Sequence, residues 1–347
     1  MSRTVAIIGA GVSGLTCGVL FAEHGYRTAI FAKETGQQTT SGAAAALWFP
    51  YDVEPARRVI LWAIDGYKTL VDLSRDSRTG VSIIELRQFS RAGQIQIPDW
   101  AIPLGAQAVI PSRPSVFPSE VENGAAGEAA TWTGRPKAER TGGERIKSLK
   151  LFKSGFSLRV PLMDATIYLD YLANRFVAAG GSVIADVQFE RLEDVDHKFD
   201  LAINCAGIGA RDLLQDVDLE AHRGQVAIVP KIEALSCAIV CDDAPLMYAI
   251  PRRNDCVFGG TNDISSDLAA DPATTDRIVA ECSRVLNIEK SNVLAERVGL
   301  RPFRKSGVRL ERDQLRDGRT VIHNYGHGGS GFTLSWGCAR KVVDLAG

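Results

Sequence analysis

The 347-residue chain lacks an excess of charge of either sign. Its 40 Lys and Arg residues nearly balance 41 Asp and Glu residues, for a formal net charge of −1. Partners that are themselves anionic, such as nucleic acids and membrane surfaces, usually select a basic surplus, so we expect neither. No apolar run approaches the ~18 residues of a spanning helix. The N-terminus also lacks a basic segment followed by an apolar one, so no signal peptide is predicted.

The cysteines also lack the spacing of a redox or zinc motif. The seven cysteines are an odd number, form no C-x-x-C pair, and several lie within apolar runs, which is typical of buried free thiols. This pattern favours a reducing, cytoplasmic-type compartment. Among the five histidines only His323 and His327 are close together, and their glycine-rich surroundings predict no helix that would place both on one face. We therefore predict no metal site.

The first strand and turn hold three glycines at the spacing G-x-G-x-x-G. Residues 5–8 predict a buried strand, Gly9, Gly11 and Gly14 follow, and residues 15–22 predict a helix. Such glycines permit a tight turn, let a pyrophosphate reach the backbone, and let helix and strand pack closely. The free N–H groups and dipole of the helix then bind the phosphates. We interpret the motif as a dinucleotide-binding turn rather than an ordinary βα turn.

The second predicted strand, over residues 28–32, does not end in an acidic residue. Many nucleotide-binding proteins place an acid there, about 20 residues beyond the glycines, to bind the ribose hydroxyls. Here Ala32 holds the expected position and Lys33 and Glu34 follow. This departure argues against a simple NAD site. Glu34 is equally consistent with a ribose contact and with a solvated surface charge.

Residues 39–150 give a clear structural prediction only in part. A polar turn at 39–42 precedes small residues at 43–46, which would suit either the approach of a flat, bulky ligand or tight helix packing. Residues 54–73 predict an amphipathic helix. Residues 106–150 show no period and are rich in proline, glycine, serine and charge. They indicate a long excursion or loop, to which we assign no chemistry.

The second half of the chain alternates strands and helices. Strands are predicted at 156–160, 183–185, 200–207, 223–229, 247–250 and 256–258. Asp164 is a predicted cap for a helix that runs to about 179, and Asp271 with Pro272 opens another. The strand that begins at 320 runs into glycines and a helix over 332–345, so glycine turns precede helices near both ends. Two such turns could hold a two-part cofactor.

Several stretches, in order and nearly end to end, resemble the D-amino acid oxidase family of FAD flavoproteins. They are residues 5–15, 44–51, 204–207 (N-C-A-G), 223–225 (R-G-Q), 248–251 (Y-A-I-P), 298–302 (V-G-L-R-P), 322–331 (I-H-N-Y-G-H-G-G-S-G) and 336–338 (W-G-C). The resemblance implies an α/β fold with a Rossmann-like FAD-binding domain and an interleaved antiparallel-sheet substrate domain. We expect residues 1–50, 151–215 and 296–347 in the FAD-binding domain and residues 51–150 and 216–295 in the substrate-binding domain.

The resemblance also implies a reaction and the residues that perform it. The expected activity is oxidation of neutral or apolar D-amino acids, by hydride transfer to flavin N5, to give 2-oxo acids, ammonia and H₂O₂. Arg301 would clamp the substrate carboxylate through a bidentate fork, Tyr248 would donate to it, and the Gly329 carbonyl would accept from the amine. From the residues alone, Arg301 suits a structural ion pair equally well, and Tyr248 a core position. His327 is expected to stabilise its turn rather than act as a base.

The remaining predicted site residues form the substrate pocket and the FAD site. Phe49, Leu246 and Met247 would make the pocket apolar. Arg252 and Arg253 lie near enough in the sequence to suggest D-aspartate as a substrate, although they follow a proline and we expect them to face solvent. The predicted FAD-binding residues are Gly9, Gly11, Val12, Ser13, Gly14, Lys33, Glu34, Thr40, Ser41, Ala45, Ala46, Leu47, Val187, Cys205, Ala206, Gly207, Arg301, Gly328, Gly329, Gly331, Phe332 and Thr333.

Other activities stay open at this stage. They are a D-aspartate or a glycine or sarcosine oxidase, a quinone-linked D-amino acid dehydrogenase, and a flavin-binding protein without catalysis. The partners implied are a small-molecule D-amino acid and O₂, with a homodimer as one candidate assembly. The C-terminal residues 345–347 lack a Ser-Lys-Leu-type address, which favours a cytoplasmic location.

Overall fold

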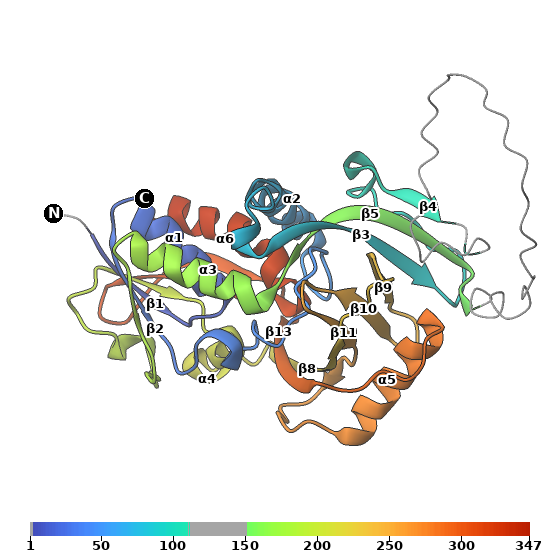
Figure 1. The fold of residues 1–347 in the computed structure, drawn as a ribbon. Helices are drawn as coiled ribbons and strands as arrows, with labels where there is room; N and C mark the ends of the chain where they lie inside the picture. Colours follow the sequence, from blue (N-terminus) through green and yellow to red (C-terminus); the bar gives the residue numbers. More distant parts are fainter. Residues whose placement is uncertain (1–2, 110, 112–150) are drawn as a thin grey trace, which may run out of the picture.

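The computed structural model describes residues 3–109, 111 and 151–347, which are arranged around two β-sheets (Figure 1). The smaller sheet has six strands in the order β14-β15-β7-β1-β2-β6. Five of them are parallel, and β14 pairs with β15 in the antiparallel direction at one edge. The strands are β1 (Thr4–Ile8), β2 (Arg27–Phe31), β6 (Ser182–Ile184), β7 (Leu201–Asn204), β14 (Arg309–Gln314) and β15 (Thr320–Tyr325).

Helices pack against this sheet and against one another. The helices are α1 (Val12–Glu23), α2 (Ala56–Leu73), α3 (Ala165–Ala178), α4 (Ala210–Leu214), α5 (Pro272–Leu286) and α6 (Gly331–Ala346). Helix α1 contacts both α3 and α6, and Figure 1 shows the three near the two chain ends. The continuous apolar run of β1 is buried, as parallel strands covered by helices require.

The larger sheet has nine strands and is mainly antiparallel. Its order is β12-β8-β11-β10-β9-β3-β5-β4, and β13 also pairs with β8. Helix α5 packs on β8, β10 and β11 and buries its apolar residues Ile278, Val279, Cys282, Val285 and Leu286. The strands are β3 (Val81–Ser90), β4 (Gln107–Val109), β5 (Ser154–Met163), β8 (Leu219–Pro230), β9 (Cys237–Cys241), β10 (Met247–Pro251), β11 (Asp255–Gly259), β12 (Asp263–Ile264) and β13 (Ala295–Arg304).

The α/β fold class predicted from the sequence is confirmed, and the predicted helix caps are present. Asp164 accepts a hydrogen bond from the Thr166 N–H at the start of α3, and Asp271 accepts from two amides of α5. Strands β3, β9, β12 and β14 carry no prediction above, and within β13 only residues 298–302 do, through the family resemblance. Strand β4 falls in the stretch 106–150, which we expected to be a long excursion or loop; most of that stretch lies outside the described residues.

The predicted division into two domains stays a prediction. Strands β5 and β13 fall in ranges that we assigned to the FAD-binding domain, yet they pair with β3 and β8 of the larger sheet. The chain leaves the larger sheet after β5, through α3 to β6, and again after β13, toward β14. We therefore propose that two of the domain boundaries lie after β5 and after β13, later in the sequence than predicted.

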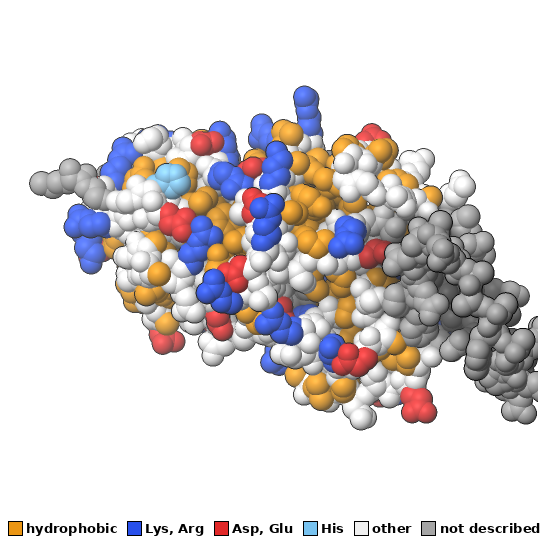
Figure 2. Space-filling view, turned by 45° about the horizontal axis from the view of Figure 1, so that its top comes forward, with side chains coloured by type: hydrophobic (Ala, Val, Ile, Leu, Met, Phe, Trp, Pro, Cys, Tyr) orange, Lys and Arg blue, Asp and Glu red, His pale blue; other side chains and the backbone are white. Residues whose placement is uncertain are grey.

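The molecular surface mixes charges of both signs. Figure 2 shows Lys and Arg side chains interspersed with Asp and Glu on the face that it draws. All seven cysteines are free and buried, as their apolar surroundings predicted. Within the described part of the chain, no helix has the length and apolar character needed to cross a membrane.

Candidate active site

A cavity of about 800 Å³ lies between the two sheets. One wall comes from the turns that follow β1, β2, β7 and β15 at the carboxyl edge of the smaller sheet, where α/β proteins bind their ligands. The opposite wall is one face of β3, β8, β9, β10 and β13 of the larger sheet. The cavity is therefore long, and the two sheets supply chemically different surfaces.

The turn after β1 has the tight packing that its glycines predicted. Gly9 has a φ of 106°, in the left-handed region that favours glycine. A Cβ on Gly14 would lie 1.9 Å from the Gly9 carbonyl oxygen, so only glycine lets α1 start this close to β1. Gly11 and Ser13 line the cavity, and the N-cap residue of α1, Gly11, has no side chain to cap the helix, although the Val12 N–H donates to Ser41 Oγ at 3.0 Å. The helix thus presents backbone N–H groups to the cavity.

The turn after β15 brings a second helix N-terminus to the same place. A Cβ on Gly331 would lie 3.6 Å from a Val12 methyl group, which puts the starts of α6 and α1 side by side. The segment that carries Phe49 and Tyr51 is tied to α6 by two hydroxyls. The Phe49 N–H donates to Thr333 Oγ1, and the Thr333 hydroxyl donates to the Phe49 carbonyl, both at 3.0 Å. In the same way, Ser330 Oγ accepts from the Tyr51 N–H and donates to the Tyr51 carbonyl, both at 2.7 Å.

His327 joins this turn to α1 through Asn324. The His327 Nε2 and Asn324 Oδ1 atoms are 3.0 Å apart, and the Asn324 amide nitrogen donates to Ser13 Oγ at 3.0 Å. Because that nitrogen is the donor, the Asn324 oxygen accepts from His327. Burial lowers the pKa of His327 to about 4, so the ring is neutral at pH 7. These contacts are those of a residue that stabilises its turn.

Arg301 and Tyr248 meet on the wall formed by the larger sheet. The Arg301 Nη1 atom donates to the Thr261 carbonyl at 2.9 Å and to Asn262 Oδ1 at 3.0 Å. A Cβ on Gly224 would lie 2.4 Å from Arg301 Nη2. The guanidinium therefore lies flat over a strand position where any side chain would displace it.

The Tyr248 ring has a similar platform. A Cβ on Gly259, which pairs with Tyr248 across the sheet, would lie 2.0 Å from the ring. Burial raises the pKa of Tyr248, and the nearby Arg301 charge partly offsets the rise. The phenol therefore keeps its hydrogen at neutral pH and can donate it to a ligand. A guanidinium and a phenol donor thus converge in the cavity, as a carboxylate requires.

Most of the residues predicted for the site line this one cavity. Phe49 and Leu246 do so, as do Gly329 and nearly all the predicted FAD-binding residues. Met247, Gly14 and Thr333 do not. Met247 is fully buried in the core beside α5, since neighbours of Tyr248 on a strand face the opposite side. The Thr333 hydroxyl donates to the Phe49 carbonyl rather than into the cavity.

The two arginines that suggested D-aspartate as a substrate lie outside the cavity. Arg252 is 8% exposed, which corrects our expectation that it faces solvent. Its guanidinium binds the Asp255 carboxylate at 2.6 and 2.8 Å. Arg253 is exposed, as expected, and donates to the Ser77 carbonyl. Neither guanidinium is therefore placed to bind a substrate.

Several lining residues have no counterpart among the predicted ones, notably Tyr51, Gln88, Val240 and Asp242. Tyr51 is the last residue of the stretch 44–51 that carries part of the family resemblance, so its position in the sequence could have suggested it. Burial raises its pKa to about 12, while the Arg301 charge lowers it. Gln88 lies on β3, Val240 lies on β9, and Asp242 directly follows β9. Only the register of these strands brings the three residues to the site.

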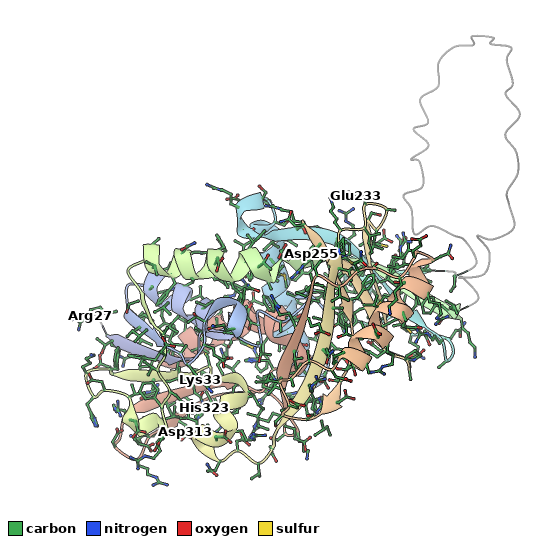
Figure 3. All side chains as sticks on the ribbon, turned by 60° about the horizontal axis from the view of Figure 1, so that its bottom comes forward. Arg27, Lys33, Glu233, Asp255, Asp313 and His323 are labelled. Carbon is green, nitrogen blue, oxygen red and sulfur yellow. The ribbon has the colours of Figure 1, made fainter. Side chains whose placement is uncertain are left out.

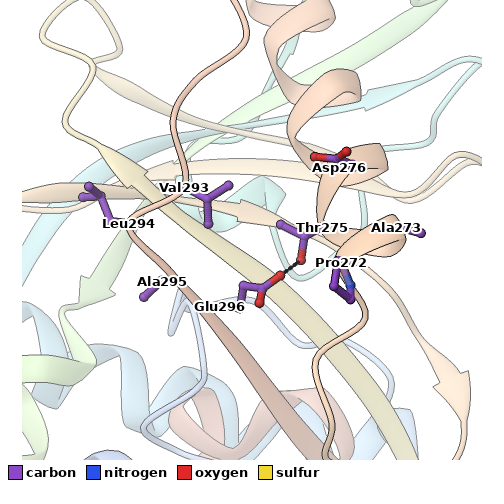
Figure 4. Close-up of a pocket in the computed structure, with 8 residues that line it drawn as sticks. All are labelled: Pro272, Ala273, Thr275, Asp276, Val293, Leu294, Ala295 and Glu296. Atoms are coloured by element: carbon purple, nitrogen blue, oxygen red, sulfur yellow. Dashed lines mark hydrogen bonds between the residues drawn. The ribbon is translucent and has the colours of Figure 1, made fainter.

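A second, shallower pocket lies between α5 and the start of β13 (Figure 4). Thr275 donates to Glu296 there, and the charged residues that line it are acidic. It offers no cation or glycine turn to a ligand. Among residues 3–109, 111 and 151–347, no group of His, Cys, Asp or Glu side chains is arranged to hold a metal ion.

Comparison with known proteins identifies the family. The model of a family described as DAO, FAD-dependent oxidoreductase, matches residues 4–345. The chain belongs to the DAO family of FAD-dependent oxidoreductases. It is 33% identical to a D-amino-acid oxidase of Rubrobacter xylanophilus over 98% of this chain and 95% of that protein. It is also 33% identical to a D-amino-acid oxidase of Streptomyces coelicolor, over 99% and 96%.

A solved structure supports the same fold. Glycine oxidase from Geobacillus kaustophilus has a TM-score of 0.76 and 16% identity, over 99% of this chain and 95% of that one. As in other DAO-family proteins, the cofactor is FAD. The cavity fits it: the N-termini of α1 and α6 suit a pyrophosphate and a flavin, and both Gly11 and Gly331, which have no side chain to block the approach, line the cavity.

Proposed function

We propose that this protein is a D-amino acid oxidase. The reaction converts a D-amino acid, O₂ and water into a 2-oxo acid, ammonia and H₂O₂. The observation that carries the proposal is the pairing of Arg301 with Tyr248 on the cavity wall opposite the glycine turns. Two relatives at 33% identity, both named D-amino-acid oxidase, support the same substrate class.

The proposed substrate site binds the amino acid at three points. Arg301 and Tyr248 bind the carboxylate, which would otherwise be too costly to take out of water. The Gly329 carbonyl accepts a hydrogen bond from the amine. Phe49 and Leu246 form an apolar wall for the side chain of a neutral or apolar substrate. With carboxylate and amine fixed, only one enantiomer can direct its α-hydrogen to the oxidant and still fit its side chain.

The residues proposed to hold FAD come from both glycine turns. The amides around Gly11, Val12 and Ser13 would bind the pyrophosphate, and Lys33 and Glu34, which line the cavity after β2, would contact the adenosine (Figure 3 labels Lys33). Residues 45–47 and 328–332 would enclose the ring. When bound, FAD supplies the two-electron acceptor that O₂ reoxidises. The protein contributes orientation and exclusion of water.

The alternative activities have less support from the site. With Arg252 and Arg253 held elsewhere, the one arginine that lines the cavity within the described residues is Arg301, which leaves no second guanidinium for D-aspartate. The apolar wall leaves room for a side chain larger than that of glycine or sarcosine. We further propose a cytoplasmic location, supported by the seven free thiols. A homodimer stays a prediction.

The test is peroxide release by the FAD-loaded protein. We expect H₂O₂ from D-alanine and none from L-alanine. The Arg301→Ala variant should lose about 10²–10³-fold in kcat/KM, because a charge-assisted contact to a desolvated carboxylate contributes about 3–4 kcal/mol. Its bound FAD should remain.

Arg297→Ala is the matched control, since Arg297 lies on the same strand but is exposed. It should behave like the unaltered protein. Equal oxidation of both enantiomers, or an Arg301→Ala variant as active as the control, would show that the proposed clamp is wrong. Turnover with an artificial acceptor but without peroxide would indicate a dehydrogenase instead.

A further inference from the structure

An acidic side chain lines the cavity on the wall of the larger sheet. Asp242 comes directly after β9, two residues beyond Val240, and both line the cavity because alternate residues of a strand face the same side. Val240 pairs with Tyr248 of β10 on one side and with Gln88 of β3 on the other. Gln88, Val240 and Tyr248 therefore form one row across three strands, with Asp242 beside it.

The polar groups at this position can accept hydrogen bonds but offer few donors. The Gln88 Nε2 atom donates to Asp242 Oδ2 at 2.8 Å, and in the described residues this is the one hydrogen bond to the Asp242 carboxylate. Gln88 is 4% exposed and lines the cavity, and its Oε1 atom has no partner among the described residues. A buried acceptor without a partner is costly, so a donor is missing here.

No cation of the described cavity wall neutralises this carboxylate. The basic residues that line the cavity there are Lys33 and Arg301. Lys33 follows β2 of the other sheet, and the Arg301 guanidinium lies over Gly224 of β8. Strand β8 is three neighbours away from β9, or on the order of 14 Å at the usual strand spacing. Burial raises the pKa of Asp242, as expected for a carboxylate without a cationic partner.

The surfaces between the two charges are apolar or aromatic. Val240 and Leu246 line the cavity between Asp242 and Tyr248, and the Tyr51 phenol senses the charges of both Arg301 and Asp242. A substrate whose carboxylate lies on Arg301 would need a side chain of several methylenes to reach Asp242. Such a chain would pass along an apolar surface and end at a carboxylate and an amide oxygen.

The geometry points to a subsite, formed by Asp242 and Gln88, that binds the cationic end of a long basic D-amino acid side chain such as that of D-lysine. This inference rests on the proposed function and widens it from neutral and apolar substrates to basic ones. It also predicts that D-aspartate and D-glutamate are poor substrates, because their side-chain carboxylates would be placed in the same cavity as the Asp242 charge.

The kinetic test compares D-lysine with D-norleucine, which has the same stem length without the ammonium group. In the FAD-loaded protein, kcat/KM should favour D-lysine by about tenfold or more, since a site built for a polar group discriminates against the analogue that lacks it. Asp242→Asn should remove most of this preference and leave D-norleucine and D-alanine oxidation nearly unchanged, which also shows that the variant folds. Gln88→Leu should reduce the preference, because the carboxylate loses its one hydrogen bond.

Glu233→Gln serves as the matched control. Glu233 lies between β8 and β9 with its side chain 81% exposed, and Figure 3 labels it. The preference should survive this change. If D-alanine and D-norleucine are oxidised but D-lysine is not preferred, or if Asp242→Asn leaves the preference intact, the subsite is wrong while the proposed function stands.

A binding measurement separates the subsite from catalysis. By calorimetry, 6-aminohexanoate should bind more tightly than hexanoate, and Asp242→Asn should equalise the two dissociation constants. Neither compound has an α-amine, so neither can be oxidised by the proposed reaction. Tighter binding of 6-aminohexanoate by a protein that oxidises no D-amino acid would support the subsite and overturn the oxidase. Equal binding to the unaltered protein would overturn the subsite.

Discussion

At the scale of single residues, two buried histidines set how the fold responds to acid. His323 on β15 and His327 in the following turn are 2% and 5% exposed. Burial lowers the pKa of each to about 4, and for His323 the nearby Arg309 charge adds to this effect although Asp313 opposes it. Figure 3 shows His323 beside Asp313.

These histidines predict a loss of stability between pH 6.5 and pH 4. In that range the unfolded chain binds protons that the folded chain does not, so the free energy of unfolding falls as the pH falls. Each histidine contributes up to about 3 kcal/mol of this loss. Urea unfolding at several pH values measures it. His327→Gln should flatten the dependence, whereas His197→Gln, with a side chain 76% exposed, should not. An unchanged slope in His327→Gln would contradict the buried, neutral ring.

Residue identities in the site were predictable to different degrees. Gly9, Gly11 and the closing glycine turn follow from local spacing, and Arg301 and Tyr248 required the family resemblance. Gln88 and Asp242 had no local signal. Their place depends on the register of β3, β9 and β10, which no single stretch of sequence specifies. Met247 was misplaced for the same reason, because neighbouring strand residues face opposite sides.

At the scale of elements, the junction of β1 and α1 is the most constrained part of the nucleotide wall. Gly14→Ala would place a methyl group 1.9 Å from the Gly9 oxygen, a backbone atom that cannot move without separating helix from strand. We expect a loss of about 1–3 kcal/mol in the free energy of unfolding and a lower bound-FAD content. This outweighs the gain in helix propensity, which is at most about 1 kcal/mol.

Melting temperature and the ratio of flavin to protein absorbance measure both effects. Gly93→Ala is the control, because Gly93 follows β3 in a loop where an added Cβ would meet no atom within 4 Å. A Gly14→Ala variant that matches this control in melting temperature and FAD content would refute the packing role of Gly14.

Elements with strong local signals were predicted with small errors at their ends. The helix predicted for 54–73 is α2, at Ala56–Leu73, and the strand predicted at 156–160 extends to Ser154–Met163 as β5. Strand β14 went unpredicted because it is an edge strand rich in charge, which removes the alternation that marks a half-buried strand.

At the scale of the whole molecule, the two ends of the chain build one wall of the site and the middle builds the other. The turns after β1 and β15 place α1 and α6 side by side, although more than 300 residues separate Ser13 and Asn324 in the chain. Strand β13 then brings Arg301 from the larger sheet to face them. The family resemblance implied both sheets, whereas the way they share a cavity depends on long-range pairing.

The central claim is that FAD lies between these walls and that Arg301 presents a D-amino acid to it. Absorbance spectra of the purified protein, before and after anaerobic addition of D-alanine, test it most directly. We predict bound oxidised flavin that D-alanine bleaches and that L-alanine leaves unchanged. A protein that stays colourless when FAD is supplied, or a flavin that D-alanine does not reduce, would contradict it.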